Sequence, residues 1–83
     1  MNDENKIIHE LAVNHTLRAK QIYYLIDSEH SYQAVFKMIK TMVNEEILDK
    51  DGLDYKLNED YISNMIDFVE VLKTHPREEF NEL

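Results

Sequence analysis

The stretch SYQAVFKMIKTMVNEEIL, residues 31–48, decides the fold of this 83-residue chain. Its apolar positions recur at the spacing of one helix face, and Ser31 precedes them as an N-cap. The pattern predicts a helix over residues 32–44 that packs inward through Val35, Met38 or Ile39, and Met42. The opposite face is aromatic, amide and cationic and contains no acid; its members are Tyr32, Gln33, Phe36, Lys37 and Lys40.

Upstream of this stretch, the apolar periodicity predicts two shorter helices, over residues 4–13 and 18–26. Asn2 or Asp3 is positioned to cap the first helix, and Leu17 is expected to be a short extended residue that enters the core. The polar segment 27–30 has the length of a tight turn between two helices. The chain holds one Gly and one Pro, so most of it should be helical.

Downstream, the apolar period changes from helical to two, which is typical of strands. Residues 47–50 and 53–57 flank Asp51-Gly52, and this predicts a β-hairpin with a type I′ turn centred on those two residues. Asn58 then caps a last helix that ends by residue 75, because Pro76 disfavours a helical residue before it. We therefore expect one mainly helical domain over residues 1–76, ordered α-α-α-β-β-α, and a frayed acidic tail over residues 77–83.

The composition argues against several classes of function. The chain has no Cys, which excludes thiolate metal sites and a Cys nucleophile, and its single Gly excludes glycine-rich phosphate loops. Adjacent acids on a helix point apart, so paired carboxylates for acid–base catalysis are not expected. No apolar run reaches the roughly 20 residues of a membrane span. We expect an intracellular, cytoplasmic protein that is not an enzyme and has no cofactor. We also expect no metal site, because no two of the four histidines have the spacing of metal ligands on a helix: His9, His15, His30 and His75.

The charge is unevenly distributed. Seventeen acids and nine bases give the chain a net charge of −8. Between residues 16 and 44, however, four cations face only two acids, Asp27 and Glu29, so this segment carries +2 and the remainder −10. A net negative protein repels phosphate, but the acids avoid the central segment, where a nucleic acid would meet the long helix.

The order of elements and the residues at key positions resemble a winged helix-turn-helix domain. Residues 31–48 are similar to the recognition helix and wing entry of that superfamily, and residues 17–22, LRAKQI, to the start of its second helix. With residues 55–62, YKLNEDYI, the chain is most similar to small archaeal winged-helix transcriptional regulators, over residues 5–74. Two departures stand out. Glu46 occupies a position that is usually Gly, and the hairpin carries Asp49, Asp51 and Asp54, whereas such wings are usually basic.

The resemblance implies a sequence-specific regulator that binds double-stranded DNA and acts by site occupancy. The helix over residues 32–44 would enter the major groove. Gln33 would pair with adenine and Lys37 with guanine, while Tyr32 and Phe36 would contact sugar or a thymine methyl group. The remaining cations would hold phosphates: Arg18, Lys20, Lys40 and Lys50. Alternatively, these are ordinary solvated side chains, and Phe36 is covered by the hairpin or by a protein partner.

The last helix has more apolar residues than packing on one side requires. We expect either the helix over residues 4–13 or the last helix to pair with its copy in a twofold dimer. Such a dimer would present two recognition helices about one DNA turn, ~34 Å, apart. The alternative is a core closed on three sides in a monomer. The expected dimer residues are Tyr61, Met65, Phe68 and Leu72.

A second class of function stays open. The net charge of −8 also suits a winged-helix module that binds no DNA and docks a basic protein partner through its acidic surface. The sequence favours DNA because the long helix is free of acids on its outer face.

Overall fold

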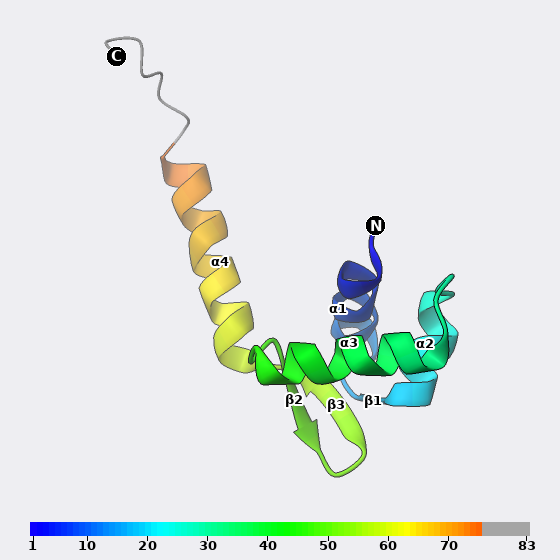
Figure 1. Cartoon of the computed structure of the whole chain (residues 1–83). Helices are drawn as coiled ribbons and strands as arrows, with labels where there is room; N and C mark the ends of the chain where they lie inside the picture. Colours follow the sequence, from blue (N-terminus) through cyan, green and yellow to red (C-terminus); the bar gives the residue numbers. More distant parts are fainter. Residues whose placement is uncertain (76–83) are drawn as a thin grey trace.

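The computed structural model describes residues 1–75 and shows a mainly helical domain with a small antiparallel sheet (Figure 1). The described chain runs through α1 (Asp3–Asn14), β1 (Leu17–Arg18), α2 (Ala19–Ile26), α3 (Tyr32–Asn44), β2 (Leu48–Asp51), β3 (Asp54–Leu57) and α4 (Glu59–Thr74). The predicted helices are confirmed to within one residue at each end, and Asn2, Ser31 and Asn58 cap α1, α3 and α4 through side-chain oxygens. The layout is compatible with a winged helix. The predicted tail, residues 77–83, and Pro76 lie outside the described residues.

The core lies between α1, α2, α3 and the sheet. Ile7, Ile22, Val35, Ile39 and Met42 are fully buried there, so α3 packs inward through Ile39 rather than Met38. Leu17 is confirmed as an extended residue that enters the core. It lies in β1, which pairs with β3 opposite Tyr55. The strand order is therefore β1-β3-β2, and the second helix starts directly from the sheet.

The hairpin turn differs from the prediction by one residue. Asp51 pairs with Asp54 across the two strands, so the two central turn residues are Gly52 and Leu53, not Asp51 and Gly52. Of these two turn residues, Gly52 alone has a positive φ, 63°, as the first central residue of a type II′ turn requires. This turn needs positive φ at the glycine alone, whereas a type I′ turn would need it at a second residue. Leu53 is consequently a turn residue and 65% exposed.

The end of α3 forms a left-handed cap at Glu46, the position that is usually Gly in the domains that the sequence resembles. Ile47 N–H donates to Met42 O over 2.9 Å, and Glu46 N–H donates to Val43 O over 3.0 Å, which together make a Schellman motif. The φ of Glu46 is 62°, a value that favours glycine. The cap is therefore present and strained.

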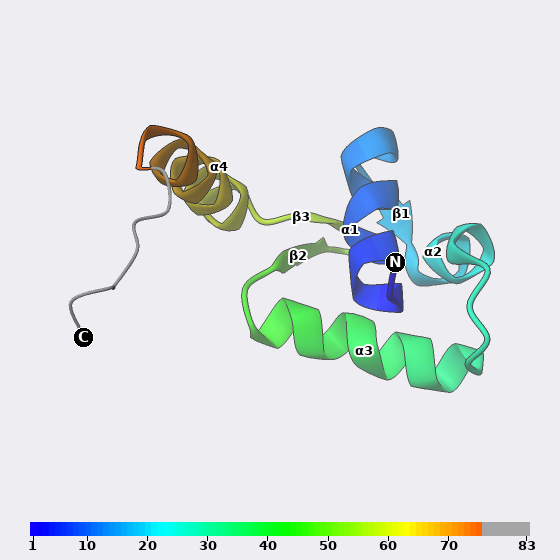
Figure 2. The same ribbon diagram turned by 90° about the horizontal axis from the view of Figure 1, so that it is seen from above.

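The last helix does not join the core. None of the residues of α4 is buried, and Figures 1 and 2 show α4 projecting away from α1, α2 and α3. Only its first turn is fixed to the domain: Asn58 N–H donates to Ile47 O, the Asn58 amide donates to Asp49 Oδ1 over 2.9 Å, and Tyr61 and Ile62 are half-buried. α4 therefore contributes no residue to the core of the described chain.

Candidate nucleic-acid interface

A cluster of aromatic rings lies on the outer side of α3, at its N-terminal half. The rings of Tyr32 and Phe36 stack with centroids 5.8 Å apart, and Tyr23 from α2 meets Tyr32 edge-on at 5.5 Å. The Tyr23 hydroxyl donates to the carbonyl of His30 over 3.0 Å, which anchors the cluster to the α2–α3 turn. Phe36 is half-buried and packs against the hydrophobic core, and it lines a hollow together with Lys50 and Leu53 of the hairpin.

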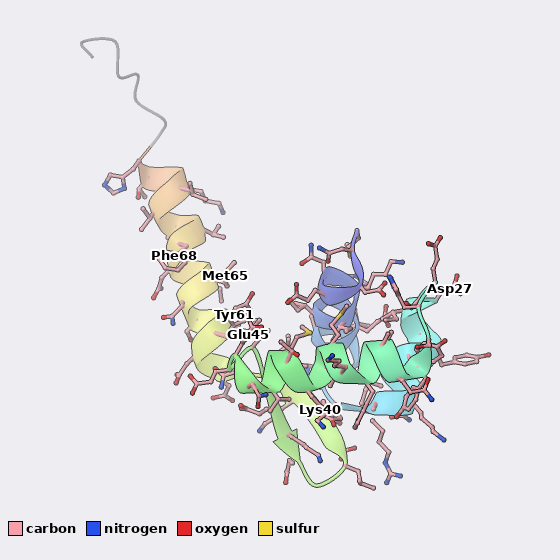
Figure 3. All side chains as sticks on the ribbon, viewed as in Figure 1. Asp27, Lys40, Glu45, Tyr61, Met65 and Phe68 are labelled. Atoms are coloured by element: carbon pink, nitrogen blue, oxygen red, sulfur yellow. The ribbon has the colours of Figure 1, made fainter. Side chains whose placement is uncertain are left out.

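Two lysines lie over these rings. Lys20 Nζ is 6.0 Å from the Tyr32 ring centroid, and Lys40 Nζ is 5.7 Å from that of Phe36. Such cation–π contacts at exposed sites contribute about 0.5–1 kcal/mol each. They hold two positive charges close to an apolar surface, and Figure 3 shows Lys40 on α3, above the hairpin.

Two shallow hollows adjoin the rings and share Tyr32 and Phe36. The first, about 410 Å³, runs along α3, and its further lining residues are Gln33, Lys37, Lys40, Thr41 and Asn44. The second, about 340 Å³, lies between α2, α3 and the hairpin, and its further lining residues are Arg18, Ala19, Lys20, Lys50, Leu53 and Tyr55. Among residues 1–75, no carboxylate lines either hollow. The structure thus places all eight predicted DNA contacts around these hollows, and we refer to them as the aromatic–basic face: Arg18, Lys20, Tyr32, Gln33, Phe36, Lys37, Lys40 and Lys50.

The hairpin acids lie at the border of this face. Asp54 Oδ1 is 3.9 Å from Arg18 Nε, an ion pair between exposed side chains. Asp49 accepts the hydrogen bond from Asn58 and is thereby directed to the start of α4. Of the three hairpin acids, only Asp51 has no such contact among the described residues. Arg18 is the one predicted phosphate contact whose charge is partly compensated.

Tyr55 forms the floor between α3 and the hairpin. It is 3% exposed and lines the second hollow from below. Burial raises the pKa of its phenol, and Tyr32 acts in the same direction. The ring therefore stays neutral and supports the aromatic cluster without adding charge.

The α3 N-terminus adds to the positive character of the face. Ser31 Oγ accepts from the Ala34 N–H over 3.2 Å, and no acid occupies the first turn. The partial positive charge of the helix dipole is therefore uncompensated beside Tyr32 and Gln33.

A second polar cluster joins the start of α1 to the α2–α3 turn, and no sequence pattern indicated it. Ser28 Oγ donates to Asp3 Oδ2 over 2.6 Å, His30 Nδ1 lies 3.1 Å from the same oxygen, and His30 N–H donates to Ser28 Oγ. The hydrogen bond from Ser28 is the main reason that the pKa of Asp3 is lowered, against the opposing effect of burial. Both side chains bind the carboxylate, so the cluster ties α1 to the α2–α3 turn. It borders an open hollow of about 710 Å³ whose acids are Asp3, Glu4, Asp27 and Glu29.

Within residues 1–75 no three His, Asp or Glu side chains gather as a metal site would require. None of the helices in that range combines the length and the apolar character needed to cross a bilayer.

The predicted dimer residues all lie on α4, apart from the aromatic–basic face. Figure 3 shows Tyr61, Met65 and Phe68 along the projecting helix.

Comparison of the chain with protein-family models, with curated proteins and with solved structures found no match.

Proposed function

We propose that this protein is a winged helix-turn-helix domain that binds duplex DNA through its aromatic–basic face and regulates transcription by occupying its site. One observation carries the proposal. Five of the nine cations of the chain line two adjoining hollows around a stacked aromatic pair, and no carboxylate of residues 1–75 lines either hollow. In a chain with a net charge of −8, this segregation supports an anionic ligand at this face.

Duplex DNA suits the shape of this face. A single exposed helix about 20 Å long fits the major groove, which is about 12 Å wide. Lys37 and Gln33 project from the exposed side of α3, and these residue types pair with guanine and adenine edges. Tyr32 and Phe36 offer apolar surface for a thymine methyl group or a sugar. Lys20, Lys40 and Lys50 flank the helix at the places where phosphates of the groove walls would pass.

The hairpin has a smaller part in this proposal than a basic wing would have. Asp54 partly compensates Arg18, and Asp51 would face phosphate at the hairpin tip. We therefore assign binding to α3 and the start of α2, with Lys50 as the contact from the hairpin. Few phosphate contacts imply a weak dependence of affinity on salt, since each contact contributes about 0.9 to the slope of log K against log salt.

The alternative is a module that docks a basic protein partner and binds no DNA. The acids of the hollow beside α1 and the net charge of −8 favour this alternative. Among the described residues, the hollow beside α1 and the aromatic–basic face have no residue in common. Substitutions on the aromatic–basic face therefore distinguish the two proposals.

The test is duplex binding by the Lys37→Ala/Lys40→Ala variant, followed by fluorescence anisotropy of a labelled mixed-sequence duplex. Both lysines are exposed, so the fold should be retained within about 1 kcal/mol. We expect affinity at low salt to fall at least tenfold and the salt slope to flatten by about 1–2. Lys6→Ala/Lys56→Ala is the matched control, because it removes the same two charges at positions outside both hollows. An equal loss in the control, or no loss in the double variant, contradicts the proposal.

A further inference from the structure

The α4 helix presents a continuous apolar surface that nothing in the described chain covers. At 100° per residue, the apolar side chains other than Val71 fall on one side of α4, and the polar side chains other than Lys73 fall on the other side. Met65 is 45% exposed, Phe68 62% and Leu72 74%. We call this surface the α4 apolar face; it comprises Tyr61, Ile62, Met65, Ile66, Phe68, Val69 and Leu72.

The size of this face fits a protein interface. At about 100 Å² for a fully exposed aliphatic side chain, its exposed part is on the order of 400 Å². A standard interface covers about 800 Å² per partner, of which a little more than half is non-polar. The apolar share that a stable interface needs is thus present on this one helix. The cap by Asn58 and the half-buried first turn hold the rest of α4 away from the core of the described chain.

The pattern within the face matches a second copy of the same helix. Ile62, Met65, Val69 and Leu72 alternate spacings of three and four, which is the seam of a two-stranded coiled coil. When a second copy of α4 runs in the opposite direction, each of these apolar residues lies opposite another apolar residue of the same four. Ile62 would meet Leu72 of the second copy, and Met65 would meet Val69.

The charges select the direction. The acids Glu59 and Asp60 occupy the first turn of α4, and Lys73 is the cation of its last turn. In a parallel pair these groups would lie beside like charges. In an antiparallel pair Glu59 lies opposite Lys73 of the second copy, both flanking the seam, and the two helix dipoles oppose each other.

We propose that α4 pairs with α4 of a second copy in an antiparallel twofold dimer. This proposal rests on α4 alone and holds whether or not α3 binds DNA. The seam is short, about 15 Å from Ile62 to Leu72, so the dimer should dissociate in the micromolar range.

Engineered disulfides test the direction, because the chain contains no cysteine. Ile62→Cys and Leu72→Cys chains are prepared separately and mixed in a glutathione redox buffer. We expect the mixed disulfide to dominate over either self-linked dimer, since ten residues, or about 15 Å, separate position 62 from its own counterpart in the antiparallel pair. Ser63→Cys on the polar face is the control and should not link. Self-linking of each chain as rapid as mixed linking overturns the antiparallel arrangement.

Sedimentation equilibrium of the unmodified chain tests pairing itself. We expect twice the chain mass of 9.9 kDa at 100 μM. Met65→Glu should raise the dissociation constant at least tenfold, while the adjacent Asn64→Glu, which adds the same charge to the polar face, should leave it within twofold. Met65 is not part of the core, so both variants keep the thermal unfolding of the domain at a concentration where the protein is monomeric. A monomer at 100 μM, or equal effects of the two variants, overturns the proposal.

Discussion

Replacing Glu46 by glycine should stabilise the protein. Glu46 occupies the left-handed position of the α3 Schellman motif, with a φ of 62°. A left-handed conformation costs a residue with a side chain roughly 1–2 kcal/mol, whereas glycine adopts it freely. Glycine also makes the unfolded chain more flexible, which offsets about 0.4–1 kcal/mol of this gain. The Glu46 side chain is exposed and forms no hydrogen bond or ion pair among the described residues, so no contact is lost. The net expectation is a gain of about 0.5–1 kcal/mol.

Thermal unfolding followed by circular dichroism measures this gain. For a domain of this size, about 1 kcal/mol shifts Tm by roughly 4–8 °C, so Glu46→Gly should raise Tm by about 2–8 °C. Glu45→Gly is the matched control, because Glu45 precedes it with a φ of −84° and already has favourable geometry. The control should lower stability by about 0.5–1 kcal/mol. A Glu46→Gly variant that is no more stable than the unmodified chain, or that behaves like Glu45→Gly, refutes the strained cap.

Three further substitutions probe the core, the α1 tie and the buried phenol. Ile39→Ala should cost about 2–5 kcal/mol in urea unfolding, because Ile39 is fully buried and its loss leaves a cavity, whereas a cost below about 1 kcal/mol would contradict the core assignment. Ser28→Ala removes the main hydrogen bond that lowers the pKa of Asp3, so it should cost about 1–2 kcal/mol at pH 7. Because the pKa of Asp3 is lower in the folded chain than in the unfolded chain, its carboxylate stabilises the fold above the unfolded pKa, and this stabilisation is lost as pH falls through the folded pKa. The difference in unfolding free energy between Ser28→Ala and the unmodified chain should therefore shrink below pH 4. An equal difference at pH 3 and pH 7 would argue against the tie. Because burial raises the pKa of Tyr55, stability should decline as pH rises above 10, and Tyr55→Phe should reduce that decline, as urea midpoints between pH 9 and 11 would show.

The elements were predictable because their signals are local. Ser31 and Asn58 precede periodic apolar segments, and each caps the helix that the sequence predicts there. The apolar period alone distinguishes α3 from the hairpin. These signals depend on neighbours within one or two helical turns, which the sequence displays directly.

The features that were missed depend on distant partners. The hairpin turn moved to Gly52 and Leu53 because the pairing of Leu48 with Leu57 and of Lys50 with Tyr55 sets the register. The tie between Asp3 and Ser28 joins residues 25 positions apart, and no local pattern marks it. The apolar stripe of α4 is equally consistent with burial and with projection, and only the direction fixed at Asn58 decides between them.

The candidate site was predicted as one helix face together with cations from the preceding helix and the hairpin, and the structure adds how these residues lie around the same rings. Helical spacing alone groups Tyr32, Phe36 and Lys40. It does not show that Lys20 from α2 and Lys50 from the hairpin border the same rings. Nor does it show that Asp54 lies beside Arg18, because this pair depends on the pairing of β1 with β3.

The most direct test of DNA binding through α3 is an NMR titration of the isotope-labelled chain with a mixed-sequence duplex at low salt. Low salt favours even non-specific contact, so the experiment does not require the target sequence. The proposal predicts shifts of backbone amides at Arg18, Lys20 and residues 32–40, with Lys50 as the response from the hairpin. An absence of shifts, or shifts confined to α4 and the acidic hollow beside α1, would contradict it and favour the protein-docking alternative.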